Sequence, residues 1–351
     1  MPKQQKPIQT VWPIHAASWD KKKLDKILKS IAGARVLVIG DVGVDRYTIG
    51  LVERISPEAP VPIVWVQEEK LKLGLAANVA DNIKALGGVP LLVGLVGKDR
   101  NAEDFRNLLK QSDIQISHLV VDASRRTVLK ERIVSESQQL LRVDYENHIK
   151  IDQKIYTQVL KKIQTIMPDC DAVIVEDYAK GLLTKDFVEE IFFQARKYKK
   201  VVAVDPNLKT PLSFYQGATV LTPNTKEAEK LSGISITDEK SLMQAGTVLL
   251  KETLAQYIII TRGKEGMAVF AQDSHTVKWT PTYAREVYDV SGAGDTVIAV
   301  LALVLSMGAS IEDAAILGNL AAGVEVSKRG TATVSPDEIR QALDFFSVMR
   351  V

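Results

Sequence analysis

The second half of the chain alternates short apolar segments with amphipathic ones, and this alternation restricts the possible folds more than any other feature. The apolar segments have the length of buried strands and lie at 172–175, 201–204, 219–221 and 257–260. Segments with helical spacing lie between them, at 184–198, 226–231 and 242–250. Strands that alternate with helices form a parallel sheet with helices on both faces. The sequence therefore predicts an α/β fold with a doubly wound, mostly parallel sheet sandwiched by helices.

Composition is ordinary for a globular protein and argues against several classes of function. Hydrophobic residues make up 46% and charged residues 25% of the 351 residues, and the net charge of +2 argues against a nucleic-acid surface. No apolar run approaches the ~18 residues that span a bilayer, and the N-terminus lacks the apolar core of a signal peptide. The single cysteine, Cys170, fits a reducing compartment. We expect a cytoplasmic protein that binds neither nucleic acid nor a membrane.

Two β-rich stretches interrupt the alternation in the first half of the chain. The first covers about 47–66 and surrounds a proline-rich turn, and the second covers about 119–143. Proline is tolerated at turns and edges but not in central strands, so the first stretch fits a small flap outside the main sheet. We expect an N-terminal extension at 1–20, followed by one domain at 21–351.

The segment Asp289–Thr296 carries the strongest chemical signal. Gly292, Ala293 and Gly294 allow close approach of the backbone to a ligand and precede an apolar helical run. The first amides of a helix lack internal partners and lie at its positive end, which suits a phosphate. Asp295 falls in that first turn, where a carboxylate beside a bound anion is disfavoured unless it acts, for example by taking a proton from an attacking hydroxyl. The segment predicts phosphoryl transfer; the alternative is an ordinary helix start with an acidic residue.

Two further segments follow predicted strands and leave alternatives open. Asn224 and Glu227 are three residues apart across a strand-to-helix turn. They form either a capping box or a pair that organises Mg²⁺ through water, since Mg²⁺ keeps several waters in most protein sites. The stretch with Thr261, Gly263 and Gly266 either lines a nucleotide site or is only a turn.

Polar residues near the first predicted strand are candidates for substrate recognition. Asp41 and Asp45 directly follow the strand at 35–40 and can accept hydrogen bonds from sugar hydroxyls, or one of them can cap a turn. The sequence at 40–45 is not a dinucleotide fingerprint, because β-like residues and no helix follow it. Asn78 offers a donor and an acceptor, as recognition of a polyol needs, or it has only a structural role.

Taken in this order, the segments resemble the ribokinase-type (PfkB) sugar kinases from about Arg35 to Phe346. Longer ungapped runs resemble the bacterial D-glycero-β-D-manno-heptose-7-phosphate kinases within that family. Because the chain ends soon after the kinase region, the resemblance is to the stand-alone form rather than to the form fused to an adenylyltransferase. The runs are 52–63, 138–144, 177–181, 284–296 and 322–336.

The resemblance implies a ribokinase-like fold with a β-lid and an ATP-dependent kinase. The implied reaction phosphorylates the anomeric O1 of heptose 7-phosphate to the 1,7-bisphosphate, in ADP-heptose and lipopolysaccharide core biosynthesis. Asp295 corresponds to the catalytic base, and the amides of Gly292, Ala293 and Gly294 to the anion hole. The β-lid in such kinases also forms a homodimer contact, so the resemblance implies a homodimer.

The same resemblance assigns the remaining ligands to residues. Asn224 and Glu227 match the Mg²⁺–ATP motif, with Mg²⁺ held through water. The positions that match nucleotide-binding residues are Thr261, Gly263, Gly266 and Asn319. The positions on the sugar side are Asp41, Asp45, Asn78 and Lys180, and Arg132 and Arg142 compete with Lys180 for the 7-phosphate.

Two departures from the family pattern concern the sugar pocket. Gly74-Leu75 replaces a usual pair of glycines, and Gly43 stands where a bulky residue is common. A leucine cannot take every backbone conformation of glycine and adds bulk. The alternatives are therefore a kinase for another sugar phosphate or a nucleoside, and a regulator that binds a sugar phosphate without turnover.

Overall fold

A nine-stranded, mostly parallel sheet forms the centre of the molecule within the residues that the computed structural model describes. These residues are 10–15, 19–136, 138–147, 149–272, 274, 276–328 and 330–348. One strand near an edge, β14 (Met267–Ala271), runs antiparallel to both of its neighbours. The strand order is β1 (Thr10–Pro13), β15 (Thr276–Thr280), β14 (Met267–Ala271), β13 (Tyr257–Thr261), β12 (Val220–Leu221), β11 (Val201–Asp205), β10 (Ala172–Glu176), β2 (Arg35–Gly40) and β5 (Val89–Val93).

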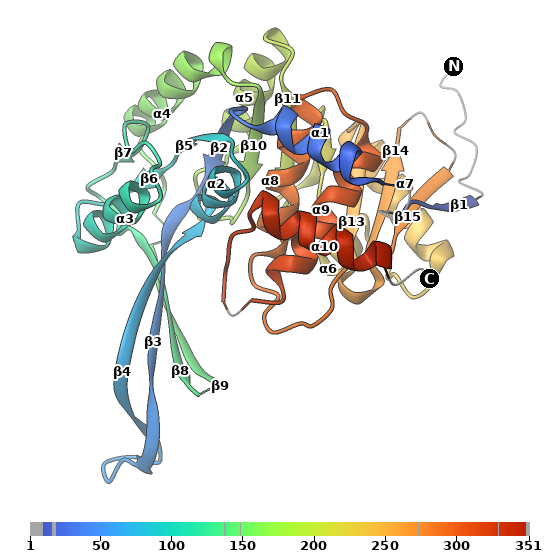
Figure 1. Cartoon of the computed structure of the whole chain (residues 1–351). Coiled ribbons are helices and arrows are strands. Elements are labelled where there is room, and N and C mark those ends of the chain that lie inside the picture. The colour runs from blue at the N-terminus through green and yellow to red at the C-terminus, as the bar shows by residue number, and fades with distance from the viewer. Residues whose placement is uncertain are drawn as a thin grey trace.

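Helices cover both faces of this sheet, as the alternation predicts (Figure 1). The core on one face contains side chains of α1 (Lys21–Ile31), α2 (Ala76–Ala85), α3 (Arg100–Gln111), α8 (Ala293–Ser306), α9 (Ile311–Glu325) and α10 (Pro336–Val348). The core on the other face contains side chains of α4 (Gln153–Ile166), α5 (Lys185–Lys197), α6 (Thr225–Ser232) and α7 (Glu239–Thr253). Every residue of α8 from Thr296 to Leu305 is buried, because this helix is apolar on all sides and lies between the sheet and α9. Across the described chain, no helix combines the length and apolarity needed to cross a membrane.

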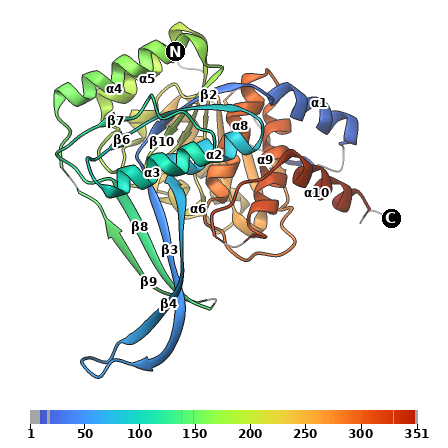
Figure 2. The ribbon, with the colours of Figure 1, turned by 60° about the vertical axis from the view of Figure 1, so that its left-hand side comes forward.

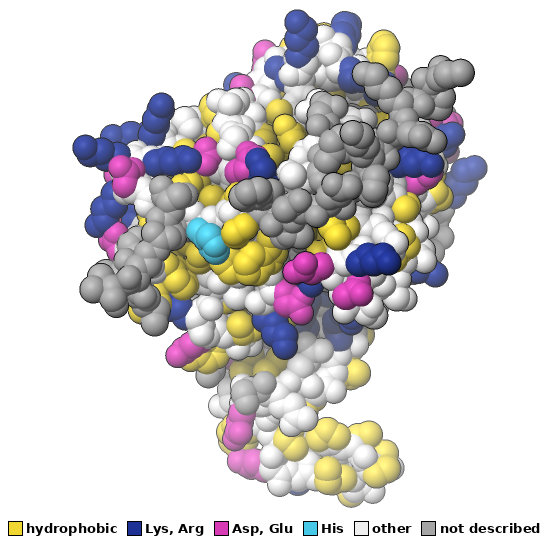
Figure 3. Space-filling model, turned by 90° about the vertical axis from the view of Figure 1, so that its right-hand side faces the viewer, with side chains coloured by type: hydrophobic (Ala, Val, Ile, Leu, Met, Phe, Trp, Pro, Cys, Tyr) yellow, Lys and Arg dark blue, Asp and Glu magenta, His cyan; other side chains and the backbone are white. Residues whose placement is uncertain are grey.

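A second, four-stranded sheet projects away from the body as an arm (Figures 1 and 2). Its strand order is β4 (Pro62–Leu75), β3 (Val42–Ile55), β8 (Val128–Ser135) and β9 (Gln138–Tyr145). The arm strands extend beyond the predicted stretch at 47–66, because β3 starts directly after the core strand β2 and β4 runs directly into α2. Large apolar side chains are exposed on the arm, and hydrophobic side chains gather at its far end (Figure 3).

Several elements lie where the sequence pattern does not predict them. The sequence pattern does not predict the helices α3, α4 and α10. The strand β1 lies inside the predicted N-terminal extension, where it pairs with β15. Residues 1–9 and 16–18 of that extension lie outside the described residues. The remaining short elements are β6 (Leu95–Val96), β7 (Val120–Val121), η2 (Met167–Asp169), η3 (Leu212–Tyr215) and η4 (Gly263–Glu265).

Candidate active site

The candidate site lies where the carboxyl ends of β10 and β11 meet the N-terminus of α8. Side chains alternate along a strand, so Ala172 and Ile174 of β10 face α8, and Glu176 at the end of the strand does the same. Glu176 is the register partner of Asp205 on β11, which brings the two carboxylates side by side. In doubly wound sheets ligands bind beyond this edge of the sheet.

Asp295, the predicted base, occupies the first turn of α8 and is held by two hydrogen bonds. The side-chain amide of Asn78 donates to its Oδ2 at 2.5 Å, and the Tyr178 hydroxyl donates to its Oδ1 at 3.1 Å. Burial raises the pKa of Asp295 to about 6, although both hydrogen bonds act in the opposite direction. A carboxylate with this pKa is ionised at neutral pH yet basic enough to accept a proton in a transition state.

The loop before α8 requires glycine at the predicted anion hole. Gly292 has φ 100°, a left-handed conformation that favours glycine. A Cβ on Gly292 would lie 3.0 Å from Oε1 of Glu325 and 3.1 Å from Nδ2 of Asn78, so a side chain there would displace the residue that holds the base. The Asp289 carboxylate fixes this loop by accepting hydrogen bonds from the amides of Ser291 and Gly330, at 2.9 and 3.2 Å. Ala293 and Gly294 follow in the first turn of the helix, and Gly294 is exposed.

A cavity of about 350 Å³ opens beside this turn. It is lined by the four residues whose positions match nucleotide-binding residues, Thr261, Gly263, Gly266 and Asn319. Its wall combines apolar side chains with backbone of glycine and alanine, as a flat, mostly apolar ring system needs. The predicted residues in the wall are Thr261, Gly263, Gly266, Asn319, Ala293 and Gly294. Asn319 also has a structural role, because its side-chain amide donates to the carbonyl of Pro281 at 2.6 Å.

Asn224 and Glu227 form the capping box that was one of the two sequence interpretations. The Glu227 amide donates to Oδ1 of Asn224 at 3.1 Å, and the Asn224 amide donates to Oε2 of Glu227 at 2.8 Å. The box places both residues at the start of α6. Burial raises the pKa of Asp205, and the nearby Glu227 charge raises it further. The pair thus lies at the edge of the site, with part of its oxygen atoms already hydrogen-bonded.

The residues predicted for the sugar side lie at the base of the arm. Asp45 pairs with Arg132 at 3.0 Å, and both side chains are largely buried. Asp41 accepts a hydrogen bond from the Lys180 amide at 3.0 Å, and burial raises the pKa of Asp41 to about 6. The Lys180 ammonium pairs with Glu146 at 2.6 Å.

Arg142 differs from the other two basic candidates for the 7-phosphate. Its guanidinium pairs with Asp144 on the same strand, and 52% of its side chain is exposed. Lys130, which the sequence does not single out, lies beside Tyr178, the residue that donates a hydrogen bond to Asp295. Its ammonium is 5.2 Å from the centre of the Tyr178 ring, and burial lowers the pKa of Lys130 while Asp45 raises it.

The two departures differ in their structural setting. Leu75 is the N-cap residue of α2 and has φ 59° and ψ −141°, a conformation that L-residues rarely adopt, and its side chain is buried. Gly43 has a packing reason: a Cβ there would lie 2.5 Å from the carbonyl oxygen of Val128, so glycine lets β3 and β8 approach. The missing side chain at Gly43 therefore points at the neighbouring strand of the arm.

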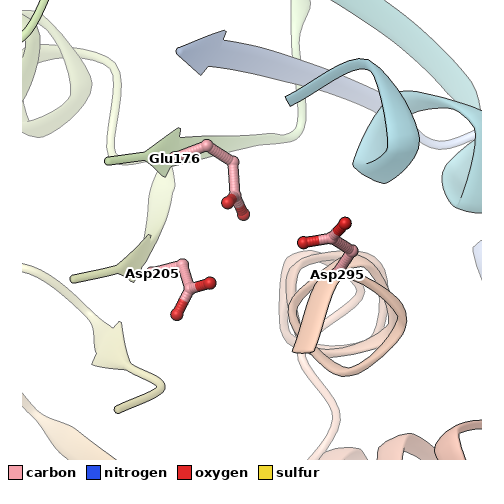
Figure 4. Close-up of side chains that lie close together, drawn as sticks. All are labelled: Glu176, Asp205 and Asp295. Atoms are coloured by element: carbon pink, nitrogen blue, oxygen red, sulfur yellow. The ribbon is translucent and has the colours of Figure 1, made fainter. Parts of the chain in front are cut away.

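Glu176 and Asp205 are part of the site, but neither is among the residues that were assigned a role from the sequence. Glu176, Asp205 and Asp295 each present one carboxylate oxygen to a common point, with these oxygens within 4.8 Å of one another (Figure 4). Burial, followed by the neighbouring carboxylates, raises the pKa of both Glu176 and Asp205 well above the usual range. Position indicates Asp205, which directly follows the predicted strand at 201–204, and the same signal at the end of the strand at 172–175 could have found Glu176.

Sequence comparisons place the chain among carbohydrate kinases. A family model described as pfkB family carbohydrate kinase matches residues 34–338. The bifunctional protein HldE of Geobacter sulfurreducens is 41% identical over 326 residues, which cover 93% of this chain and 66% of that protein. The bifunctional protein HldE of Helicobacter hepaticus is 41% identical over 307 residues, which cover 88% of this chain and 63% of that protein. The chain thus spans slightly less than two thirds of the length of these relatives.

Solved structures share the fold at low sequence identity. Phosphofructokinase-2 from Escherichia coli, in complex with substrates and products, has a TM-score of 0.75 and 18% identity, covering 90% of this chain and 100% of that chain. The ribokinase of Arabidopsis thaliana, complexed with ribose and ATP, has a TM-score of 0.71 and 17% identity, covering 90% of this chain and 99% of that chain. The fold is therefore ribokinase-like, as predicted. Because the pfkB model matches most of the chain, the protein belongs to the pfkB family of carbohydrate kinases and is a phosphotransferase with an alcohol acceptor.

Proposed function

We propose that the protein uses ATP to phosphorylate the anomeric O1 of D-glycero-β-D-manno-heptose 7-phosphate. The observation that carries this proposal is the position of Asp295. It lies between the apolar cavity and the polar residues at the base of the arm, and it is held there by Asn78 and Tyr178. Relatives at about 40% identity named HldE, together with the long runs that resemble heptose 7-phosphate kinases, support the choice of sugar.

In this mechanism Asp295 takes the proton of the O1 hydroxyl while that oxygen attacks the γ-phosphorus of ATP. The bond from phosphorus to the bridging oxygen of ADP breaks, and ADP leaves with the electron pair. General-base help of this kind contributes roughly 10²–10⁴-fold in rate. Positioning and charge stabilisation provide the rest, through the helix-terminal amides at Gly292, Ala293 and Gly294.

ATP occupies the 350 Å³ cavity, with its adenine against the apolar wall and its phosphates toward the first turn of α8. Mg²⁺ that accompanies ATP would neutralise phosphate charge. Asn224 and Glu227 would hold it through water, since their capping box leaves one Glu227 oxygen outside the box. The carboxylates at the ends of β10 and β11 fit the same hard cation.

The 7-phosphate is bound by the basic residues at the base of the arm. Lys180 and Arg132 are both largely buried, and their carboxylate partners hold them in place. A doubly charged phosphate therefore meets two cations that are already positioned. Arg142 is the weaker candidate because it is exposed. Asp41 and Asp45 accept hydrogen bonds from the sugar hydroxyls.

The arm is the β-lid, and we propose that it forms the contact of a homodimer. Exposed apolar side chains on it include Ile55, Val61, Trp65 and Leu141, of which Trp65 is 62% exposed. Such a surface on an extended sheet favours pairing with a second copy. Light scattering of wild type and of Trp65→Ser tests this: the wild type should have the mass of a dimer, and the variant should shift toward the monomer. A monomeric wild type would contradict the dimer.

A panel of acceptors tests the proposed substrate. ADP release is measured with Mg²⁺–ATP and β-heptose 7-phosphate, its α anomer, fructose 6-phosphate, ribose or adenosine, and ³¹P NMR locates the new phosphate. We expect turnover with the β-heptose phosphate and a phosphate on O1. Turnover only with another acceptor would replace the substrate but keep the kinase. Binding of sugar and nucleotide without any ADP release would favour the regulator.

A further inference from the structure

A short turn at 177–181 connects the two halves of the site. It follows β10, and its second residue, Tyr178, donates a hydrogen bond to Oδ1 of Asp295 at 3.1 Å. Its fourth residue, Lys180, donates from its backbone amide to the Asp41 carboxylate at 3.0 Å. The same five residues therefore hold the base and contact the sugar side, so the conformation of this turn affects both.

The turn has a conformation that its own sequence does not favour. Ala179 has φ 53°, in the left-handed region that alanine rarely adopts, and Gly181 has φ 103°. A residue other than glycine persists in this region only where its surroundings fix it. The Asp177 carboxylate provides one such contact, because its Oδ1 accepts a hydrogen bond from the Ala179 amide at 2.7 Å. The turn therefore depends on the position of Asp177.

A buried tyrosine holds Asp177 from the core on the other face of the sheet. The Tyr215 hydroxyl donates to Oδ2 of Asp177 at 2.6 Å and accepts a hydrogen bond from the Asn207 amide at 3.1 Å. Tyr215 is the last residue of η3, and its side chain lies in the core that contains α4 to α7, whereas α8 with Asp295 lies on the opposite face. A hydrogen bond to a carboxylate is stronger than one between neutral groups, so the Tyr215 hydroxyl fixes Asp177 firmly.

A second tyrosine from the same core holds the other end of the turn. The hydroxyl of Tyr156, on α4, donates to the carbonyl of Gly181 at 2.8 Å. The rings of Tyr156 and Tyr215 are both buried among apolar side chains. A phenylalanine at either position would keep this packing and remove only the hydroxyl that reaches the turn.

We propose that Tyr215 and Tyr156 are positioning residues of the kinase reaction, which hold the turn at 177–181 so that Tyr178 meets the base and Lys180 meets the sugar side. The proposal deepens the proposed function, on which it rests for the role of Asp295. The turn contributes no residue to the wall of the cavity that we assign to ATP. Loss of either hydroxyl should therefore lower kcat and raise the KM for the acceptor, while the KM for ATP stays the same.

Steady-state kinetics of Tyr215→Phe and Tyr156→Phe are the first test, with Mg²⁺–ATP and the acceptor that the wild type uses. A misplacement of about 1 Å can cost roughly 10²-fold in rate, so kcat should fall by about 10–10²-fold in each variant. Thr253→Val is the matched control. It removes a buried hydroxyl from α7, the helix that packs on η3, and keeps the Thr253 carbonyl that accepts a hydrogen bond from Gly217. The control should leave kcat and both KM values unchanged.

A double-mutant cycle separates positioning from a general loss of stability. If Tyr215 acts on kcat through Tyr178, Tyr215→Phe combined with Tyr178→Phe should have nearly the kcat of the slower single variant. Independent effects would multiply instead. A multiplied loss of kcat overturns the proposal, and so does a kcat of Tyr215→Phe equal to that of the wild type. Circular dichroism melting shows whether each variant is folded.

Hydrogen exchange followed by mass spectrometry tests the turn without any substrate. The amides of Ala179 and Lys180 donate to carboxylates, so the peptide that covers 177–181 should exchange at least about tenfold faster in both tyrosine variants than in the wild type and Thr253→Val. Unchanged exchange overturns the proposal. Turnover of the wild type only with another acceptor would replace the heptose and leave both comparisons intact, so failure of the proposed substrate and failure of this proposal give different results.

Discussion

Leu75 offers a direct test of how much strain the start of α2 carries. Its backbone has φ 59° and ψ −141°, in a region of the conformational map that is close to exclusive for glycine. Such a conformation costs an L-residue about 1–3 kcal/mol. Leu75→Ala removes the buried side chain but keeps the strained Cβ, whereas Leu75→Gly removes both. The difference between the two variants therefore isolates the backbone.

The expected difference follows from two opposing terms. At an ordinary position glycine is less stable than alanine by about 0.5–1 kcal/mol, because it is more flexible in the unfolded chain. Relief of about 1–3 kcal/mol of strain outweighs this, so Leu75→Gly should be more stable than Leu75→Ala by roughly 0.5–2 kcal/mol. Ala80→Gly, inside the same helix, is the control and should show the opposite sign.

Urea denaturation followed by circular dichroism at 222 nm measures the free energy of unfolding of all four proteins. Two differences in stability are compared: Leu75→Gly against Leu75→Ala, and Ala80→Gly against wild type. If glycine is less stable than alanine by the same amount at both positions, the backbone at Leu75 is not strained. The result also bears on function, because Leu75 sets the start of the helix that carries Asn78, and Asn78 holds the catalytic Asp295.

Three further predictions concern the site. Because Asp295 must be ionised to accept a proton and has a pKa of about 6, kcat/KM should rise with pH through about 6 and level off above it. Tyr178→Phe removes a hydrogen bond that lowers this pKa, so its rising limb should move to higher pH; an unchanged profile would contradict the assigned base. A Cβ on Gly266 would lie 1.9 Å from a carbonyl oxygen of β15, so Gly266→Ala should weaken ATP binding at least tenfold by calorimetry, and wild-type affinity would refute that reading. Lys72 of β4 donates a hydrogen bond to the carbonyl of Thr331, a residue that lies beside Gly292. Lys72→Met should therefore raise the KM for sugar more than the KM for ATP, and equal effects on both would argue against a role of this contact in sugar binding.

Sequence patterns predict the sheet well because its strands are buried on both faces and therefore read as continuous apolar runs. The core helix α8 was predicted for the same reason, since it is apolar on all sides. The helices α3 and α4 were not predicted, although each buries one stripe of side chains at helical spacing. Their N-caps, Asp99 and Asp152, were readable signals, since each accepts a hydrogen bond from an amide of the first turn.

The site shows where sequence reasoning stops. The segment with Asp295 was found because its chemistry and its helix start are contiguous in the chain. The cluster with Glu176 and Asp205 was not, because it depends on the register between β10 and β11, which brings together residues 29 positions apart. The same limit applies to Leu75: the sequence indicates a leucine in place of glycine, but only the structure shows the glycine-like backbone.

The most direct test of the account is the rate of ADP release by Asp295→Asn with Mg²⁺–ATP and β-heptose 7-phosphate. Asparagine keeps the size of the side chain and can still meet Tyr178, so binding of both substrates should persist by calorimetry. The account predicts that kcat falls by roughly 10²–10⁴-fold, the contribution of a general base. A kcat within a factor of about three of wild type would contradict the central claim that Asp295 takes the proton from the acceptor hydroxyl.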